Sequence, residues 1–415
     1  MPTRVLVLSG QRTVQQLKEL TDHDVLFAEQ DMTLDQVMLA DYPLEVDFAD
    51  WAKVADQVAQ AHAAQPIDAV VTGVERLVPL AGILRERLGL AHGITEQAAR
   101  DCMDKAATHR LLTEAGVPVA AHRVVTSADD GAAAAARLTL PVVVKPRDAS
   151  SAAGLKYCDT EEDVRLAVDG ILATGRDSAL IEEFLTGPEF GVFAARVQGH
   201  TRVVWVVEAE VGPPPTFVKV GGHFPSRLPA GQLAELEELT GRALAAVGLD
   251  DWVAALQFML TPDGWRAGEI NPRVPGGQAV EMILSTTGHE PSLIAADAAL
   301  GRETAPQAPR VACGLYRSIV FDRAGRIDYS LSAAASLTGL ESPVAPFVEF
   351  DVQPGEAVLE VGHPRGGAFG RIVLGGDSPE QLERDLATVL EQLAVRLRDE
   401  PVTDDAVDRA HTSCC

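Results

Sequence analysis

Short apolar runs alternate with amphipathic stretches in the first hundred residues. The runs VLVL at 5–8 and IDAVVT at 67–72 are short and apolar, which predicts buried strands. The stretches at 51–63 and 75–88 repeat their apolar residues at helical spacing, which predicts two helices. Strands and helices that alternate in this way predict a doubly wound α/β unit.

The middle of the chain mixes helices with longer strands. A helix is predicted over 104–115, because Gly116 and Pro118 follow it as stop signals. The apolar patterns further predict strands at 140–146, 179–185, 190–197 and 201–210 and a helix at 232–247. Residues 212–222 contain three consecutive prolines and are expected to form a loop of functional length.

Two strands that together suit a β-hairpin carry the most informative polar residues. LQFML at 256–260 precedes a Pro-Asp-Gly turn, and WRAGEINPR at 265–273 follows it. Residues two apart in a strand project from the same face, so Glu269 and Asn271 should point the same way. Arg273 lies just beyond them.

The turn sets which residues of the hairpin face each other. If Pro-Asp-Gly is a three-residue loop with its glycine in the left-handed conformation, Thr261 pairs with Trp265. Counting back places Gln257 opposite Glu269, so that one carboxylate and two amide oxygens share a face and suit Mg²⁺. The alternative is an ordinary hairpin with a polar face, and a slip of one residue turns Gln257 away.

After residue 309 the pattern changes to short strands joined by glycine-rich turns. The strands are predicted at 313–321, 347–350, 357–361 and 371–374. A final helix is predicted to start at Ser378, with proline next and Gln381 three residues on. Its apolar stripe should consist of Leu382, Leu386, Val389, Leu390 and Leu393. This part therefore predicts a small α+β unit.

Charge and composition narrow the class of protein. The 415 residues carry a net charge of −25, which argues against nucleic acid or an acidic membrane surface as a partner. The chain shows neither a signal sequence nor a membrane-length apolar stretch, so a cytoplasmic location is expected. Cys102, Cys158 and Cys313 are expected to be reduced and buried, and the terminal Cys414 and Cys415 to lie in a tail.

Lysine is scarce among the 35 basic residues, and two of the lysines lie at the ends of predicted elements. Lys105 begins a helix, and Lys145 ends a strand before a loop of small residues, RDASSAAG at 147–154. Backbone N–H groups of such a loop, together with an ammonium, can bind a polyphosphate. The alternative for each lysine is a solvated surface charge.

The order of these elements resembles the ATP-grasp superfamily of carboxylate–amine or carboxylate–thiol ligases, from about residue 65 to residue 275. The resemblance implies an ATP-grasp fold, combining α/β and α+β parts, with an N-terminal doubly wound α/β domain and a small C-terminal α+β domain. The domains are expected at 1–100, at 101–308 for the nucleotide-binding and catalytic region, and at 309–400, with a tail at 401–415.

The resemblance also implies roles for single residues. Contacts to the ATP phosphates are implied for Lys105, Lys145, Ser150, Ser151 and Gly154. Contacts to the adenine are implied for Glu182, Glu183 and the backbone of Leu185, and contacts to the ribose for Glu189. Mg²⁺, with Mn²⁺ as an alternative ion, should be held by Gln257, Glu269 and Asn271. Arg273 should steady the transferred phosphoryl group. The family more often has a carboxylate at position 257, which leaves the binding of a second metal open.

Within the superfamily the chain looks most like the L-amino-acid ligases. The segment FVKVGGHFPSRL at 217–228 resembles a loop of those enzymes, with Lys219 where they usually have Glu. His223 stands one position late, so catalysis and loop hydrogen bonding both remain open for it. Residues 212–229 are the candidate lid.

The implied function is ATP-dependent formation of an amide, peptide-like bond through an acyl phosphate, with release of ADP and phosphate. The substrates would be a small carboxylate and a small amine, such as amino acids, and a homodimer is left open. One alternative is an ATP-grasp enzyme with another acceptor, as in carbamoyl-phosphate or carboxylase chemistry. Another is a nucleotide-binding regulatory protein without catalysis.

Overall fold

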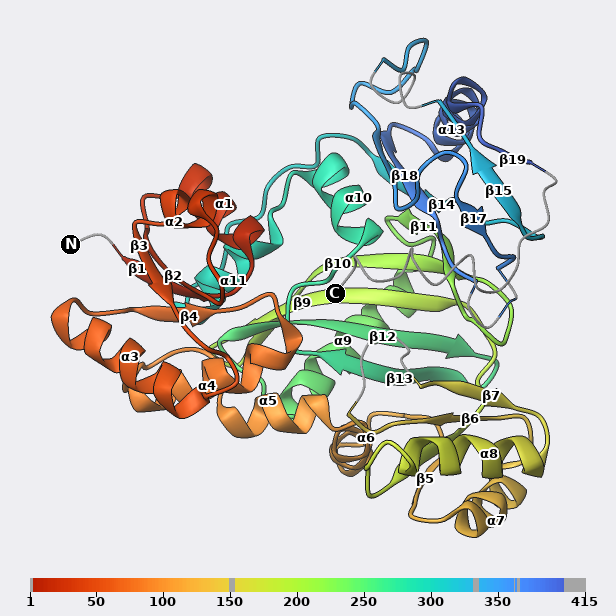
Figure 1. The fold of residues 1–415 in the computed structure, drawn as a ribbon, viewed down its shortest axis with the longest axis horizontal. Helices are drawn as coiled ribbons and strands as arrows, with labels where there is room; N and C mark the ends of the chain where they lie inside the picture. The colour runs from red at the N-terminus through yellow and green to blue at the C-terminus, as the bar shows by residue number, and fades with distance from the viewer. Residues whose placement is uncertain (1–2, 149–153, 331–335, 362, 364–365, 399–415) are drawn as a thin grey trace.

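The computed structural model describes residues 3–148, 154–330, 336–361, 363 and 366–398. A large sheet crosses the middle of the molecule, and three smaller parts surround it (Figure 1). No helix within these ranges is both long and apolar enough to cross a membrane. Cys102, Cys158 and Cys313 are buried free thiols, as predicted.

The N-terminal part is a parallel four-stranded sheet in the order β3-β2-β1-β4, with helices around it. Its strands are β1 (Arg4–Leu8), β2 (Asp24–Glu29), β3 (Tyr42–Glu45) and β4 (Ala69–Val71). The helices are α1 (Gln11–Leu20), α2 (Leu34–Leu39), α3 (Trp51–Ala64), the 3₁₀ turn η1 (Glu75–Leu77) and α4 (Val78–Arg87). The predicted α/β unit is confirmed, although the sequence pattern did not reveal β2, β3, α1 or α2.

A second, antiparallel sheet of four strands lies beside one edge of the large sheet, in the order β5-β8-β6-β7. Its strands are β5 (His122–Val125), β6 (Val142–Lys145), β7 (Lys156–Cys158) and β8 (Ala179–Glu183). Two helices pack on it and enclose a separate apolar core: α7 (Ala128–Leu138) and α8 (Glu161–Leu172). The chain enters this part through α5 (Glu96–Met103) and α6 (Lys105–Glu114).

The large sheet has eight strands in the order β13-β12-β9-β10-β11-β14-β18-β16. They are β9 (Glu189–Val197), β10 (His200–Val211), β11 (Lys219–Phe224), β12 (Trp252–Thr261), β13 (Gly264–Asn271), β14 (Cys313–Ser318), β16 (Phe347–Phe350) and β18 (Gly370–Gly376). The associated helices are α9 (Ala230–Ala246), α10 (Gln278–Thr287) and α11 (Pro291–Ala299). Because β14, β16 and β18 continue the sheet from beyond residue 309, hydrogen bonding crosses the expected domain boundary, and the division into domains stays a prediction.

The predicted loop at 212–222 is partly wrong, because β11 begins at Lys219. This strand pairs with β10 on one side and β14 on the other. A Cβ on Gly222 would lie 2.3 Å from the Tyr316 ring, so the close approach of β14 requires a glycine here. Residues 219–224 therefore form a strand despite their loop-like composition, because β11 is hydrogen-bonded to a strand on each side.

The C-terminal part adds a three-stranded sheet and one long helix. The strands are β15 (Gly325–Asp328), β17 (Ala357–Val358) and β19 (Arg396–Arg398), and the helix is α13 (Pro379–Leu393). The Ser378 hydroxyl accepts a hydrogen bond from the Gln381 backbone N–H, which confirms the predicted cap. The predicted stripe is wrong at Leu390, which is 37% exposed because it lies at the edge of the buried face.

The β12–β13 hairpin has the predicted facing residues but a different turn. Thr261 pairs with Gly264, not with Trp265, so the loop has two residues instead of three. A β-bulge at Gly268 then adds one residue to β13, and Gln257 again lies opposite Glu269. The shorter turn and the bulge therefore compensate for each other, and the residues of the polar face pair as predicted.

Candidate active site

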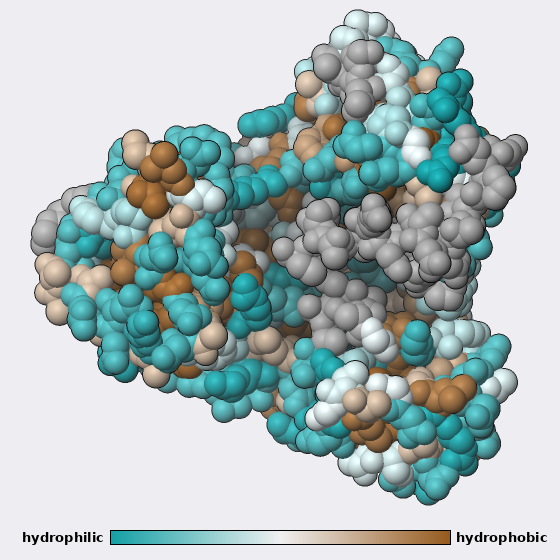
Figure 2. Space-filling view, in the orientation of Figure 1, coloured by the Kyte–Doolittle hydropathy of each residue, from teal (hydrophilic) through white to brown (hydrophobic). Residues whose placement is uncertain are grey.

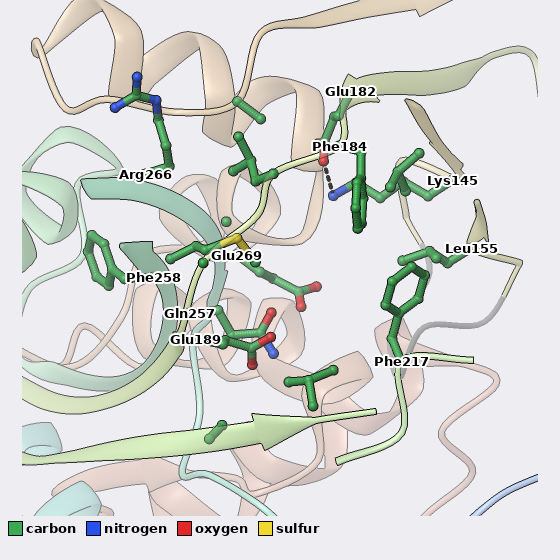
Figure 3. Close-up of a pocket in the computed structure, with 18 of the residues that line it drawn as sticks. Lys145, Leu155, Glu182, Phe184, Glu189, Phe217, Gln257, Phe258, Arg266 and Glu269 are labelled. Carbon is green, nitrogen blue, oxygen red and sulfur yellow. Dashed lines mark ion pairs between the residues drawn. The ribbon is translucent and has the colours of Figure 1, made fainter. Parts of the chain in front are cut away.

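A cavity of about 930 Å³ lies between the polar face of the hairpin and the smaller antiparallel sheet. Of the residues singled out from the sequence, it is lined by Lys105, Lys145, Glu182, Glu183, Leu185, Glu189, Gln257, Glu269, Asn271 and Arg273. Figure 3 shows Gln257, Glu189 and Glu269 close together in the cavity. Residues far apart in the sequence thus meet in one place.

Four residues of the predicted set are not among those that line the cavity in the described structure. Ser150 and Ser151 lie outside the described residues. Gly154 has a φ of 76°, and a Cβ on it would lie 2.9 Å from the Pro146 ring, so this position favours glycine for backbone reasons. His223, on β11, is the fourth, and it too is absent from the cavity lining.

The hairpin face offers the oxygen atoms that a hard cation needs. Gln257 lies opposite Glu269, and Asn271 follows two residues later on the same strand face. The described residues contain no cluster of three or more His, Cys, Asp or Glu side chains suited to a metal. Mg²⁺ usually takes few protein ligands and leaves coordination positions for phosphate oxygens. One carboxylate and two amides therefore fit Mg²⁺ better than they fit a metal ion that only protein side chains hold.

Lys105 reaches this face from the first turn of α6. Its Nζ lies 2.9 Å from Oε1 of Glu269. The helix is capped by Asp104, whose carboxylate accepts hydrogen bonds from two backbone N–H groups and from the Arg147 guanidinium. Although partial burial opposes ionisation, the hydrogen bonds from Arg147 hold the pKa of Asp104 below its ordinary value. The start of the helix, and with it Lys105, is thereby fixed to the end of β6.

Lys145 forms the second ion pair of the cavity. Its Nζ lies 2.7 Å from Oε2 of Glu182, as the dashed line in Figure 3 marks. Both side chains are largely buried. Burial opposes ionisation of Glu182, but the charges of Lys145 and His109 hold the pKa of this carboxyl below its ordinary value. The Lys145 side chain is therefore held at the cavity wall by a buried carboxylate.

An apolar wall faces the sheet on the other side of the cavity. Leu155, Phe184 and Phe217 line it together (Figure 3). The rings of Phe184 and Phe217 lie 6.0 Å apart, and Tyr157 packs edge-on against Phe184. Aromatic faces of this kind suit a flat heteroaromatic base.

The two glutamates that end β8, Glu182 and Glu183, differ in their contacts. Glu183 accepts a hydrogen bond at Oε1 from the Ala121 backbone N–H, 2.8 Å away. Its own backbone N–H donates to the Ala121 carbonyl oxygen. The side chain of Glu183 is therefore held by the protein, whereas Glu182 points to Lys145.

Arg273 connects the cavity with the N-terminal part. Its Nε and Nη2 lie 3.0 and 2.9 Å from Oε2 of Glu75, in η1. A third guanidinium nitrogen donates to the Val274 carbonyl oxygen. Glu75 was missed from the sequence, since a single glutamate before a helix gives no local signal of a distant partner.

Lys219 and His223 lie on β11 but have different surroundings. Lys219 lines the cavity, with Nζ 2.8 Å from Oε1 of Glu189. His223 instead contacts Glu210, with Nε2 2.7 Å from Oε1, and Arg317 contacts the other oxygen of that carboxylate. On β11, Lys219 therefore lines the cavity and His223 does not. From the sequence, Lys219 was noted only because the L-amino-acid ligases usually have Glu at this position.

His109 was also missed. It is buried on α6, one helical turn after Lys105, and contacts both Glu182 and Gly268. Burial lowers its pKa. The spacing of four residues from Lys105 within a predicted helix was a usable signal, because residues four apart share a helix face.

Comparisons with known proteins show similarity to ligases. Residues 111–290 match a family model described as D-ala D-ala ligase C-terminus. A D-alanine–D-alanine ligase of Ectopseudomonas mendocina is 31% identical over 168 residues, which make up 37% of this chain and 50% of that protein. Carnosine synthase 1 of Gallus gallus is 28% identical over 254 residues, 56% of this chain and 27% of that protein. The chain thus spans about half the length of the bacterial ligase, and less of the synthase.

Among solved structures, an L-amino acid ligase from Bacillus licheniformis has the same fold, with a TM-score of 0.76 at 18% identity. The match covers 97% of this chain and 99% of that chain. The whole chain therefore has the fold of that ligase, and residues 111–290 are similar to the C-terminal region of D-alanine–D-alanine ligases.

Proposed function

We propose that this protein is an ATP-dependent carboxylate–amine ligase that forms an amide bond through an acyl phosphate and releases ADP and phosphate. The observation that carries the proposal is a single cavity in which Lys105, Lys145 and the polar hairpin face converge. Cations for phosphate oxygens beside a site for a hard metal ion are what phosphoryl transfer requires. The amide-forming activities named for the bacterial ligase and for carnosine synthase support the same reaction class.

The proposed nucleotide position follows the two sides of the cavity. The adenine lies against Phe184 and Phe217, near the backbone between Glu183 and Leu185. Glu189 binds the ribose hydroxyls. The phosphates extend toward Lys105 and Lys145, with Ser150, Ser151 and Gly154 of the following loop as further proposed contacts. Glu182, Glu183 and the backbone of Leu185 are the proposed adenine contacts, and Glu182 is paired with Lys145 in this structure.

Gln257, Glu269 and Asn271 are the proposed ligands for Mg²⁺, or for Mn²⁺. The metal ion supplies positive charge that stabilises the phosphate oxygens when it is bound. Lys105, which is paired with Glu269 here, lies close enough to the same face to contact phosphate once the nucleotide is present.

In the proposed reaction the protein holds the two substrates and ATP in position and forms no covalent bond with them. A carboxylate oxygen of the first substrate forms a bond to the γ-phosphorus, and the bond to ADP breaks. The amine nitrogen of the second substrate then bonds to the acyl carbon, and phosphate leaves with the carboxylate oxygen. Arg273 stabilises the negative charge of the transferred group. The amine loses a proton, which the departing phosphate can accept.

Amino acids or their derivatives are the proposed substrates, and the cytoplasm, where ATP is available, is the proposed location. Residues 212–218 are the proposed lid, because Phe217 of this segment forms part of the cavity wall. His223 keeps the structural role of holding Glu210.

The test is a screen of paired amino acids with ATP and Mg²⁺, in which phosphate release and product mass are measured together. The proposal expects ADP, phosphate and a new amide only when both substrates of a particular pair are present. Tight ATP binding without turnover on any pair would instead support a regulatory nucleotide-binding protein. Phosphate release with bicarbonate in place of an amino acid would support the carboxylase-like alternative.

A further inference from the structure

Lys219 is the third lysine among the described residues that line the cavity, and neither the nucleotide contacts nor the metal ligands proposed above include it. Its Nζ lies 2.8 Å from Oε1 of Glu189. The lysine side chain is 42% exposed and the glutamate side chain is 18% exposed. Lys219 is therefore a cation at the surface of the cavity, held by a carboxylate of the cavity wall.

A β-bulge turns Lys219 toward the cavity. Gly221 of β11 lies opposite Glu210 of β10, but the next pair is Lys219 with Val211, so Val220 is an extra residue. With regular pairing, Lys219 would share the face of Gly221 and would project away from the face of Val211, which lines the cavity. A bulge of this kind redirects a side chain, and here it brings a cation to the site.

The neighbouring strands position the Lys219 side chain. Its backbone carbonyl oxygen accepts a hydrogen bond from the Ser318 hydroxyl, 2.7 Å away on β14. On β10, the residue opposite Glu189 is Ala209. Because the alanine side chain is small, the lysine reaches across β10 to Glu189 on β9.

The ion pair of Lys219 and Glu189 continues into the metal-binding face. Glu189 lies opposite Met259, so it is the diagonal neighbour of Gln257 on the same side of the sheet. Gln257 in turn lies opposite Glu269, and Figure 3 shows these two side chains close to Glu189. Across the cavity the row of side chains is therefore Lys219, Glu189, Gln257, Glu269 and Lys105.

This row has an ammonium at each end, a carboxylate next to each ammonium and an uncharged amide in the middle. One divalent cation fits at Gln257, Glu269 and Asn271, as proposed above. A second divalent cation would need another carboxylate, and in this row that carboxylate is Glu189. The ammonium of Lys219, which is paired with Glu189, would repel such an ion. The row therefore suits a single divalent cation.

The charge of the cavity also favours side chains as a source of positive charge. The chain has a net charge of −25, yet five of the described residues that line the cavity are Lys or Arg and four are Glu. A lysine ammonium is a compact charge that binds phosphate and needs no ligands of its own.

We propose that Lys219 is a third phosphate-binding cation and that its ammonium takes the place of a second divalent ion, so that this chain binds its nucleotide with one Mg²⁺. When the nucleotide binds, Glu189 accepts hydrogen bonds from the ribose hydroxyls, and the ammonium of Lys219 turns to the phosphate oxygens. The inference rests on the proposed function, from which it takes the positions of the nucleotide and of the metal ion.

The number of bound metal ions tests the single-ion claim. The chain is mixed with an equal amount of the β,γ-imido analogue of ATP, and bound Mn²⁺ is counted by paramagnetic resonance. One Mn²⁺ per bound nucleotide is expected. Two would overturn the inference, and this measurement needs no substitution.

A double variant tests the reason for the single ion. Lys219→Met combined with Gln257→Glu removes the ammonium and replaces the amide with a carboxylate, so this variant should bind two Mn²⁺ per nucleotide. A count of one in the folded double variant would also overturn the inference.

Lys219→Met alone tests the contact with phosphate. Calorimetry compares the affinity for the ATP analogue with Mg²⁺ and the affinity for adenosine, which has no phosphate. The analogue should bind roughly ten- to hundredfold more weakly, because one charge-assisted hydrogen bond is lost, and adenosine should bind as before. Equal losses for both ligands would mean that Lys219 only holds Glu189 beside the ribose, which would overturn the inference. Lys156→Met, at an exposed position of β7 outside the cavity lining, is the matched control and should change neither affinity.

Failure of this inference is distinguishable from failure of the proposed function. If the unsubstituted chain does not bind the ATP analogue, both are wrong. If the metal counts and the affinities are as expected but no substrate pair is ligated, the inference stands and only the proposed reaction fails.

Discussion

At the residue scale, the cavity is organised by ion pairs that are largely removed from solvent. Lys145 pairs with Glu182, and Lys105 pairs with Glu269. Removing one member of such a pair leaves the other charge without its partner and costs more than the pair itself contributes. The lysines are accordingly the most informative positions for substitution.

Lys145→Ala should lower kcat/KM for ATP by about 100- to 1,000-fold, because the transferred charge loses a preorganised cation. The measurement is steady-state phosphate release with the substrate pair found in the screen. Lys156→Ala is the control, since this exposed lysine on β7 lies outside the cavity lining and should leave the rate unchanged. Equal rates for the Lys145 variant and the unsubstituted chain would exclude Lys145 from the phosphate site.

Asp104→Asn should reveal a stability contribution that depends on pH. The pKa of Asp104 is lowered from its ordinary value of 3.8, so the folded state favours the carboxylate. Its contribution is therefore complete above that value and is lost as the pH falls through the lower folded-state pKa. Asparagine can still cap α6 but loses the charge paired with Arg147.

Urea unfolding at neutral pH should show Asp104→Asn to be less stable, and the difference should shrink toward pH ~3. Asp129→Asn, at an exposed position of α7, should show little difference at either pH. A gap for Asp104→Asn that stays constant over the whole range would contradict this account of the ion pair.

At the scale of elements, the hairpin explains both the success and the limits of sequence interpretation. The alternation of strand residues correctly predicts that Gln257 and Glu269 share a face. The turn and the bulge could not be predicted, because Pro262-Asp263-Gly264 is compatible with two loop lengths and Gly268 gives no sign of an extra residue. The pair Gln257–Glu269 was therefore predicted correctly because the error in the turn and the missed bulge cancel each other.

Other elements were missed because their determinants lie elsewhere in the fold. Strand β11 depends on partners on both sides, one of them about a hundred residues away along the chain. Glu75 contacts the site through Arg273, and His109 contacts it through Gly268 and Glu182, all of them far away along the chain. Periodicity and motif spacing reflect the local conformation of residues that are close in sequence. They contain little information about contacts between residues far apart in the chain.

Two glycines near or within elements predict opposite effects of the same substitution. Gly187, between β8 and β9, has a φ of 146°, and a Cβ there would lie 2.1 Å from the Leu260 carbonyl oxygen. Gly187→Ala should lower the free energy of unfolding by about 1–3 kcal/mol. Gly170→Ala, in α8 with no atom within 4 Å of its new Cβ, should raise it by roughly 0.5–1 kcal/mol. Denaturant midpoints measure both, and effects of the same sign would contradict the local geometry.

At the scale of the whole molecule, the site depends on how separate parts are held together. The large sheet supplies the hairpin, the smaller antiparallel sheet supplies Lys145, and the N-terminal part supplies Glu75, which holds Arg273. Figure 2 shows the recess between these parts on one face of the molecule. The proposed phosphoryl transfer, which Arg273 assists, therefore requires the N-terminal part to stay docked.

Glu75→Gln should lower turnover by roughly 10- to 100-fold, because Arg273 is no longer oriented by a carboxylate. ADP affinity should change little, because the loss lies at the transferred group and not at the base. Glu19→Gln, at an exposed position of α1, serves as the control. A loss of ADP affinity equal to the loss of turnover would show that Glu75 acts through general stability instead.

The most direct test of the central claim follows a single oxygen atom. The carboxylate substrate found in the screen is labelled with ¹⁸O, and the phosphate released during ligation is analysed by mass. Activation through an acyl phosphate transfers one carboxylate oxygen to phosphate, so labelled phosphate should form in equal amount with ADP and the amide. Unlabelled phosphate, or AMP and pyrophosphate in place of ADP, would contradict the account.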